Sequence, residues 1–156
     1  MASDKKAPGV IKNKKAYHDY HVLQTFEAGI VLLGSEVKSI RAGNAQLKGN
    51  FIQEWRGELL VEHMHISPYK FAHHLGIPAL RSRKLLLNKK EVAKIISEIS
   101  TKGISATVLS LYFKGPFVKA EIGIVRGKKL HDKRESLKQK DQKRQLDKAI
   151  KRFSVR

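Results

Sequence analysis

A group of cations beside three leucines is the first part of this sequence that could do chemistry. Residues 81–88 read Arg-Ser-Arg-Lys-Leu-Leu-Leu-Asn. If they form a strand, Leu86 points to the opposite face from its two leucine neighbours. An outward Leu86 could pack on a sugar or a base while Arg83 and Lys84 bind phosphates. Spacing alone favours the alternative, in which a helix and the rest of the fold cover all three leucines.

The last thirty-one residues hold a second concentration of positive charge. They carry 13 Lys and Arg against 4 Asp and Glu, which is +9 of the total +18. Residues 16–125 contribute only +5, and residues 1–15 contribute the remaining +4. Each Lys or Arg that meets a phosphate releases condensed counterions, so charge gathered at the ends of a nearly balanced body is suited to a polyanion.

The same tail has the pattern of a helix that forms on binding. Leu146, Ile150 and Phe153 fall at i, i+4 and i+7, and no Gly or Pro follows Gly127. Self-repulsion and the thin apolar stripe predict a tail that is disordered when free and helical when an anionic partner neutralises it. A merely solubilising tail is the alternative, but it would not need a helix-competent sequence of this length.

Enzymatic chemistry finds little support in the sequence. The chain has no Cys, which excludes thiolate nucleophiles, disulfides and Cys-based zinc sites. His63 and His65 stand two apart and could hold a metal from one strand face, although a solvated face is the better interpretation. Asp19 and Glu27 lack partners for acid–base work, and the chain contains no HExxH, P-loop or GxGxxG motif. We therefore expect no enzyme, no metal and no cofactor.

Length and composition predict one soluble domain that seeks acidic partners. The 156 residues are 41% hydrophobic, the net charge is +18 and the pI is near 10.2. The first residues lack the apolar core of a secretory signal, and the longest aliphatic run, residues 30–33, is too short to span a bilayer. We therefore expect a cytoplasmic protein that binds nucleic acid. An anionic membrane is the rival partner, disfavoured because the apolar stripe of the tail contains no Trp.

The body that must position these side chains is predicted to be mostly strands. Strands are expected at 17–26, 35–41, 50–55, 58–66, 105–114 and 117–125, with a loop at 67–83, while 27–34 fits a helix or a strand. One helix begins after the N-cap Asn88, uses Glu91 in a capping box and ends at Gly103. The fold class is therefore mainly β, a small oligonucleotide-binding (OB) barrel with packed helices.

Five short motifs, in order along the chain, resemble those of the SmpB family. They are Asn-Lys-Lys-Ala at 13–16, Phe-Glu-Ala-Gly at 26–29, Glu-Val-Lys-Ser at 36–39 with Arg-Ala-Gly at 41–43, Arg-Lys-Leu-Leu-Leu-Asn at 83–88 and Gly-Lys-Lys-Leu-His-Asp-Lys-Arg at 127–134. Each motif is weak alone, but the match in register runs from about residue 11 to residue 152. We divide the chain accordingly into a basic arm (1–12), an RNA-binding OB body (13–126) and a basic tail (127–156).

The resemblance implies a role in bacterial trans-translation. Members of the family hold the tRNA-like domain of transfer-messenger RNA and accompany it into stalled ribosomes, which resume on that RNA's own reading frame and tag the incomplete protein. The implied partners are this RNA and the decoding centre and mRNA channel of the small subunit, with elongation factor Tu and alanyl-tRNA synthetase reached through the RNA. A basic ribosomal or assembly protein is the competing class, and the RNA that co-purifies with the protein would separate the two.

The family motifs also assign residues to the RNA contact of the body. Asn13, Glu27 and Leu86 match positions that contact the tRNA-like domain, which makes an exposed Leu86 the better interpretation. Glu27 is expected to accept hydrogen bonds from base edges or 2′-hydroxyls. The cations expected to bind this RNA are Arg83, Lys84, Lys114 and Lys119.

In the tail, the resemblance to the family covers the segment that, in family members, enters the small ribosomal subunit. His131 suits stacking on an rRNA base, and Ile150 is included on amphipathic spacing alone. The helix is expected to lie along the vacant mRNA channel and to sense that it is empty, whereas residues 151–156 match no family pattern. The other residues assigned to this contact are Lys128, Lys129, Asp132, Lys133, Arg134, Lys138 and Arg144.

Overall fold

The computed structural model of the protein describes residues 9–72 and 75–154, so most of the predicted basic arm at 1–12 lies outside the described residues. The strands are β1 (Ile11–Lys12), β2 (Tyr20–Ile30), β3 (Ala45–Gln46), β4 (Phe51–Trp55), β5 (Glu58–Glu62), β6 (His65–Ile66), β7 (Arg83–Leu86), β8 (Ile104–Lys114) and β9 (Phe117–Gly127). The helices are α1 (Lys14–Asp19), α2 (Gly34–Arg41), α3 (Lys89–Ile99) and α4 (Leu130–Ser154).

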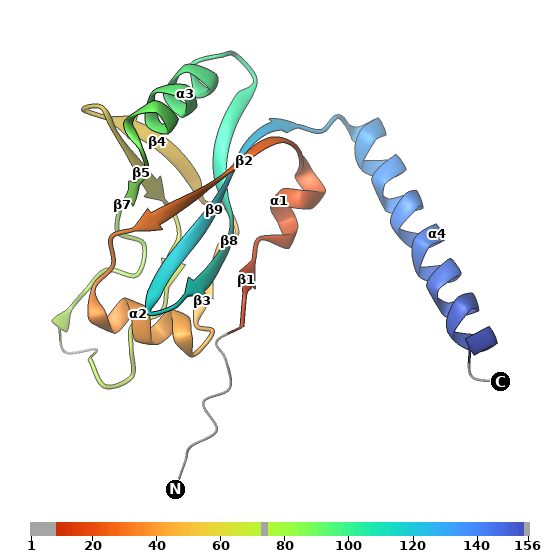
Figure 1. The fold of residues 1–156 in the computed structure, drawn as a ribbon, viewed down its shortest axis with the longest axis horizontal. Coiled ribbons are helices and arrows are strands. Elements are labelled where there is room, and N and C mark those ends of the chain that lie inside the picture. The colour runs from red at the N-terminus through yellow and green to blue at the C-terminus, as the bar shows by residue number, and fades with distance from the viewer. Residues whose placement is uncertain (1–8, 73–74, 155–156) are drawn as a thin grey trace, which may run out of the picture.

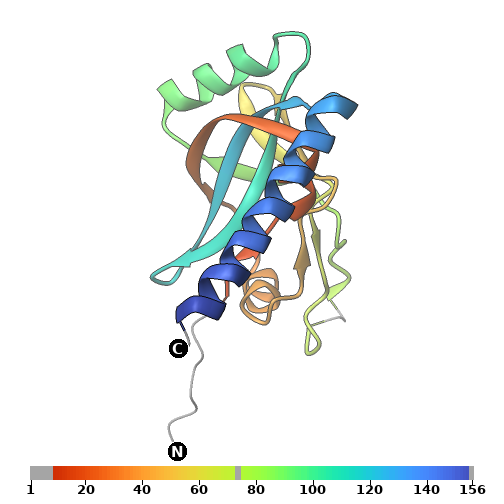
Figure 2. The ribbon, with the colours of Figure 1, turned by 90° about the vertical axis from the view of Figure 1, so that its right-hand side faces the viewer.

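One curled antiparallel sheet forms the centre of the body. Its strand order is β1-β8-β9-β2-β7-β5-β4, and β3 pairs with β6 in a separate two-stranded sheet. The strands β2, β8 and β9 have 11 residues each, and β9 pairs with both of the others along most of its length. Figures 1 and 2 show the curvature of this sheet and the helices around it. The mainly β, OB-like fold expected from the sequence is confirmed.

Side-chain amides bridge the seam where the curled sheet returns on itself, between β4 and β8. Asn50 Nδ2 donates to the Leu47 and Val108 carbonyls, and its Oδ1 accepts from the Val108 N–H at 2.7 Å and the Thr107 hydroxyl at 3.0 Å. Asn13 Nδ2 donates to the same two carbonyls, at 3.2 and 3.1 Å. In the described part of the chain, two buried amides therefore take the place of a backbone ladder between these strands.

The hydrophobic core lies inside the curl and is covered by α3. This helix packs on β8 and β9 and buries Ile95 completely. It begins as expected from the sequence, because the backbone N–H of Asn88 donates to the Glu91 carboxylate in the predicted capping box. Alternate residues of β9 point inward beneath it, and in β8 an irregularity between Val108 and Ser110 brings residues on both sides of it inward. The innermost of these, each at most 1% exposed, include Val108, Leu111, Ile122 and Ile124.

The first long strand begins three residues later than predicted. The sequence indicated a strand at 17–26, but residues 17–19 belong to α1. The cause is local: Asn13 Oδ1 accepts a hydrogen bond from the Ala16 N–H at 3.1 Å and caps a short helix. From there β2 continues to Ile30, so the open segment 27–34 is a strand over its first half.

The prediction of a strand at 35–41 is wrong, because α2 occupies this segment. The Glu36 carboxylate accepts a hydrogen bond from the Leu33 N–H at 3.3 Å, which supplies a partner to a free donor at the helix start. Ile40 is buried and Val37 packs against the core, three residues apart on one face of the helix. Their spacing is helical, and a strand would have placed them on opposite faces.

The predicted hairpin around Arg56 and Gly57 is confirmed, but its second strand is interrupted. β4 and β5 pair across a turn in which both central residues have positive φ, 52° and 77°. His63 has a φ of 58°, which ends β5, and His65 then pairs with β3. His63 therefore lies between β5 and β6, outside both strands, and the two histidines do not share a strand face. Residues 9–72 and 75–154 contain no group of three or more His, Asp or Glu side chains placed to hold a metal.

The tail is a single helix, α4, that leaves the body after β9. None of its described residues is buried, and Figures 1 and 2 show it standing beside the sheet. Its 25 residues confirm the helix expected from the amphipathic spacing, whereas disorder in the free protein stays a prediction. Within the described ranges, no helix has both the length and the apolar character needed to cross a membrane.

Candidate nucleic-acid interface

Strand register brings three of the predicted RNA-binding residues together around Gly29. This glycine, near the end of β2, pairs with Leu86 of β7 on one side and with Lys119 of β9 on the other. Glu27 lies two residues earlier on β2 and therefore on the same face of the sheet. A Cβ at Gly29 would lie only 3.3 Å from the Leu86 Cβ, so the glycine leaves the leucine room to lie across the strand.

A carboxylate held by two donors stands beside this glycine. Glu27 accepts a hydrogen bond from the Tyr112 hydroxyl and another from Lys114 Nζ at 3.1 Å, both on β8. The Glu27 side chain remains 43% exposed. We name Glu27, Leu86, Tyr112, Lys114 and Lys119 together the β2–β9 surface. It presents one fixed acceptor among lysines, next to an apolar side chain.

The hydrogen bonds set the protonation of both partners. The Tyr112 hydroxyl, followed by Lys114, holds the pKa of Glu27 below its ordinary value, so this carboxylate is charged at neutral pH. Burial, and then the hydrogen bond to Glu27, raises the pKa of Tyr112 to about 12, so the hydroxyl keeps its proton. A charged acceptor that still faces solvent suits the N–H groups of bases and the hydroxyls of ribose.

Tyr112 is the residue of this surface that sequence reasoning missed, although a signal for it was present. The predicted strands 105–114 and 117–125 are joined at Gly115 and Pro116, and a hairpin of that length places Tyr112 opposite Lys119. The structure has this register. Charge does not distinguish this residue, because a tyrosine hydroxyl is an uncharged donor.

Tyr112→Phe is expected to raise the pKa of the Glu27 carboxyl, because it removes the largest of the contributions that lower it. NMR titration of the carboxyl carbon measures this change. Tyr69→Phe is the matched control, since it removes a hydroxyl away from the β2–β9 surface and should leave the pKa of Glu27 unchanged. An unaltered pKa in Tyr112→Phe would show that the hydroxyl does not hold the carboxylate.

Leu86 is the exposed leucine of the three, as the family resemblance predicted. It is 52% exposed, whereas Leu85 is 3% exposed and packs in the core. Two shallow grooves flank it, one of about 270 Å³ that reaches Phe117 and one of about 500 Å³ that reaches Glu27. Lys119 lines both grooves. An apolar ridge between two grooves can support a sugar or a base on either side.

Lys84 lies on the same outer face of β7 as Leu86 but has a protein partner. Its Nζ lies 2.7 Å from Glu58 Oε1, and both side chains are nearly half exposed. Exposed pairs of this kind contribute about 0–1 kcal/mol, so a phosphate could replace Glu58 at small cost. Phosphate contacts of Lys84, Lys114 and Lys119 stay predictions.

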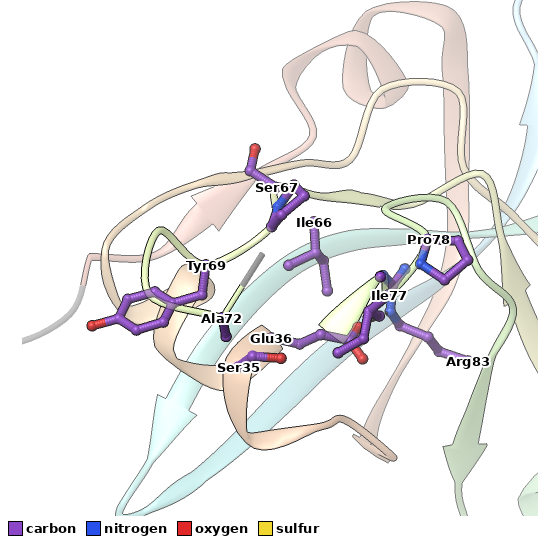
Figure 3. A pocket seen from close by; sticks show the side chains of 11 residues that line it. Ser35, Glu36, Ile66, Ser67, Tyr69, Ala72, Ile77, Pro78 and Arg83 are labelled. Atoms are coloured by element: carbon purple, nitrogen blue, oxygen red, sulfur yellow. Dashed lines mark hydrogen bonds and ion pairs between the residues drawn. The ribbon is translucent and has the colours of Figure 1, made fainter. Parts of the chain in front are cut away.

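Arg83 is a structural residue, and its prediction as an RNA contact is wrong. Strand alternation turns its side chain inward, where it is fully buried. The guanidinium donates to the Glu36 carboxylate and to the carbonyls of Met64 and Ala79. Figure 3 shows Arg83 and Glu36 among the side chains that line a pocket. The volume of this pocket is about 330 Å³. These donors serve the protein itself, and no part of the side chain reaches a phosphate outside.

Asn13 is also structural, which corrects its prediction as a direct RNA contact. Its side chain is buried, with 5% of the residue exposed. The amide oxygen accepts from the Ala16 N–H, and the amide nitrogen donates to the carbonyls of Leu47 and Val108. All its polar atoms are therefore used to start α1 and to bridge the seam of the sheet.

Comparison with known proteins adds to this geometry. The family model described as SmpB protein matches residues 10–152. The chain belongs to the SmpB family. Relatives named SsrA-binding protein include those of Pelobacter propionicus, 48% identical over 142 residues (91% of this chain, 93% of the relative), and Bacillus pumilus, 48% identical over 141 residues (90% of each). That of Staphylococcus haemolyticus is 48% identical over 153 residues, 97% of this chain and 98% of the relative.

A solved structure supports the same SmpB assignment through its fold. A chain of the structure described as "tmRNA-SmpB: a journey to the center of the bacterial ribosome" is 39% identical to this one. The two superpose with a TM-score of 0.70 over 84% of this chain and 95% of that chain. The body described above is therefore a fold that this family has in experimental structures.

In this SmpB chain, three of the predicted tail contacts hold the tail helix on the body. Lys133 Nζ lies 3.5 Å from Asp19 Oδ1 of α1, and His21 Nε2 of β2 lies 3.4 Å from Asp132 Oδ2. The Lys128 N–H donates to the Asp19 carbonyl at 2.9 Å. These contacts set the direction in which α4 leaves the body. The remaining tail residues assigned to the ribosome, which are all exposed, are Lys129, His131, Arg134, Lys138, Arg144 and Ile150.

Charge at the first turn of α4 suits the start of a helix. The hydrogen bond from His21, followed by that from the Lys129 N–H, holds the pKa of Asp132 below its ordinary value. The carboxylate is then charged at neutral pH, where the partial positive charge of a helix start favours it. Asp132 therefore stabilises the helix and anchors it through one side chain.

Proposed function

We propose that this protein binds the tRNA-like domain of transfer-messenger RNA and brings it to stalled bacterial ribosomes for trans-translation. The β2–β9 surface carries the proposal, since it combines an exposed leucine and a fixed carboxylate with lysines in a chain of net charge +18. The names of the relatives and of the similar solved structure support it. The protein would act in the cytoplasm, and elongation factor Tu and alanyl-tRNA synthetase would meet it through the RNA.

Recognition at this surface would combine three kinds of contact. Lys114 and Lys119 would bind phosphates, which supplies affinity through counterion release. Leu86 would pack against a sugar or a base, and Glu27 would accept hydrogen bonds from base edges or 2′-hydroxyls, which supplies selectivity. None of these contacts makes or breaks a covalent bond, so the protein would act by binding and positioning its RNA.

After the body has bound the RNA, the tail would act on the ribosome. The exposed cations of α4 surround an apolar stripe, so the helix could lie in an anionic groove with each face in contact. An mRNA channel that still holds its message would leave no room for it. A vacant channel would accept the helix, which gives the protein a means to recognise ribosomes without a message.

Leu86→Asp is expected to weaken binding to the isolated tRNA-like domain by about tenfold, because it replaces an apolar contact with a charge that phosphates repel. Leu80→Asp is the matched control, since it changes an equally exposed leucine, 53% against 52%, outside the β2–β9 surface. Fluorescence anisotropy with labelled RNA measures both affinities, and thermal melting tests whether both variants fold.

Equal losses in the two leucine variants would mean that added negative charge alone explains the effect, and the contact at Leu86 would be rejected. A large fall of the melting temperature in Leu86→Asp alone would instead indicate that Leu86 packs in the core. The proposed function itself fails if the unaltered protein does not prefer the tRNA-like domain over other structured RNAs of equal length.

A further inference from the structure

The hairpin formed by β4 and β5 differs in charge from the rest of the protein. Residues 51–62 carry three Glu against one Arg, which is −2 in a chain of net charge +18. Figures 1 and 2 show this hairpin across the body from the basic helix α4. Charges are screened beyond about 8 Å at physiological ionic strength, so a group that contacts the hairpin responds mainly to the charges nearby. The hairpin therefore suits a cationic partner.

Strand alternation places a leucine between two carboxylates on the outer face of this hairpin. The intervening residues of β5 are buried, so Glu58, Leu60 and Glu62 point outward. The two glutamates are four residues apart, which is about 13 Å along a strand, and Leu60 lies midway. On β4, Trp55 pairs with Glu58, and Gln53 pairs with Leu60. We name Gln53, Trp55, Glu58, Leu60 and Glu62 together the hairpin face.

At one end of the hairpin face, the carboxylate of Glu62 is held by uncharged donors. Gln53 Nε2 donates to Glu62 Oε1 at 2.9 Å, and the Ser82 hydroxyl donates to the same oxygen at 2.6 Å. These two bonds fix the direction of the carboxylate without neutralising it. In the described part of the chain, no cation forms an ion pair with Glu62. This end therefore presents a fixed negative charge to a partner.

At the other end, an exposed indole ring and a carboxylate already hold cations of the chain itself. Trp55 is 52% exposed, and the guanidinium carbon of Arg56 lies 4.4 Å from the centroid of its ring. Glu58 Oε1 lies 2.7 Å from Lys84 Nζ, and both side chains of this pair are nearly half exposed. An exposed pair contributes only about 0–1 kcal/mol, so an arriving cation can share or replace Lys84. The groups at this end bind guanidinium and ammonium ions.

We propose that the hairpin face binds an extended, arginine-rich segment of a partner protein. A guanidinium group can pair with a carboxylate and stack on an indole ring, so one arginine fits beside Glu58 and Trp55. A second arginine four residues along the segment spans the distance to Glu62, and the side chain midway between them faces Leu60. This inference goes beyond the proposed function, because it adds a protein partner on a face that repels phosphates.

The test uses the full-length protein and the end-blocked peptide Arg-Gly-Leu-Gly-Arg, which places both arginines and the leucine on one side of an extended chain. Trp55 is the single tryptophan of the protein, so its fluorescence reports occupancy of the hairpin face directly. The peptide Arg-Arg-Gly-Gly-Leu has the same composition with adjacent cations, and it should bind about tenfold more weakly. Equal affinities for the two peptides would overturn the proposal, because the spacing of the carboxylates would not matter.

Glu62→Gln keeps the shape of the side chain and removes its charge, so it should weaken binding of the spaced peptide about tenfold. Glu54→Gln is the matched control. It removes the same charge from the same hairpin, but Glu54 alternates with the outward residues of β4 and accepts a hydrogen bond from the Gly57 N–H at 2.7 Å. Thermal melting tests whether both variants fold. Equal weakening by the two variants would overturn the proposal and assign binding to the overall charge of the hairpin.

A parallel titration with RNA separates the two classes of partner. Glu62→Gln should bind the isolated tRNA-like domain at least as tightly as the unaltered protein, because it loses a charge that repels phosphates. If a four-residue adenylate RNA changes the fluorescence of Trp55 and the spaced peptide does not, the hairpin face binds RNA and the proposal is wrong. The peptide contains no nucleotide, so peptide binding that depends on Glu62 would stand even if the protein did not bind the tRNA-like domain.

Discussion

Glu36→Ala is expected to lower the free energy of unfolding by about 3–5 kcal/mol, because it leaves a buried cation without its anion. The side chains of Arg83 and Glu36 are 0% and 5% exposed, so the guanidinium would be left buried without a charged partner. Arg81 Nε donates to the same carboxylate at 2.8 Å, so two guanidinium groups lose a partner at once. In a chain of this length the melting temperature should fall by about 10 °C.

Two further variants show whether burial causes the effect. Glu58→Ala breaks the exposed pair with Lys84, whose side chains are 45% and 44% exposed, and should cost less than about 1 kcal/mol. The double variant Glu36→Leu with Arg83→Met should recover much of the loss, because an apolar pair needs no counter-charge. Urea unfolding measures all of them. A Glu36→Ala protein no less stable than Glu58→Ala would refute the structural assignment of Arg83.

Local sequence patterns predicted the elements whose stabilising contacts are local. The capping box of Asn88 and Glu91 defined the start of α3, and the alternation along 117–125 defined β9. The strand predicted at 35–41 is wrong although Val37 and Ile40 have helical spacing, and the burial of Glu36 in this segment depends on distant contacts. Glu36 is buried because Arg81 and Arg83 reach it from 45 and 47 residues away, and nothing in its own segment shows that an acid there would be enclosed.

The candidate site depends even more on distant pairing. Gly29 meets Leu86 and Lys119 only because β2 pairs with both β7 and β9, and strand partners of this kind cannot be derived from spacing. Spacing in fact favoured a buried Leu86, and the family motifs corrected this. Counting charges could not separate Arg83 from Lys84, which are neighbours in sequence but point to the core and to solvent.

Truncation after Gly127 is expected to abolish rescue of stalled ribosomes while the body stays folded and keeps its affinity for the tRNA-like domain. The cut removes α4, which contributes no buried side chain, and leaves every strand and the helices α1, α2 and α3 of the described chain. The β2–β9 surface is untouched, but the element proposed to occupy the vacant channel is gone. The measurement is a reconstituted tagging reaction on a message without a stop codon, beside anisotropy with the RNA domain.

The contributions of the apolar stripe and of the positive charge of the tail to tagging can then be measured separately in the full-length chain. Serine at Leu146, Ile150 and Phe153, which are 63%, 64% and 83% exposed, keeps every charge but removes the apolar stripe, so stability should not change while tagging falls sharply. Glutamine at Lys138 and Arg144 keeps the stripe and should weaken tagging most at low salt, because fewer counterions are released and the dependence on salt becomes shallower. Full tagging by the truncated protein would refute the tail mechanism. Loss of RNA binding together with tagging would show instead that body and tail do not act separately, because a rigid docking surface should bind without its cationic arm.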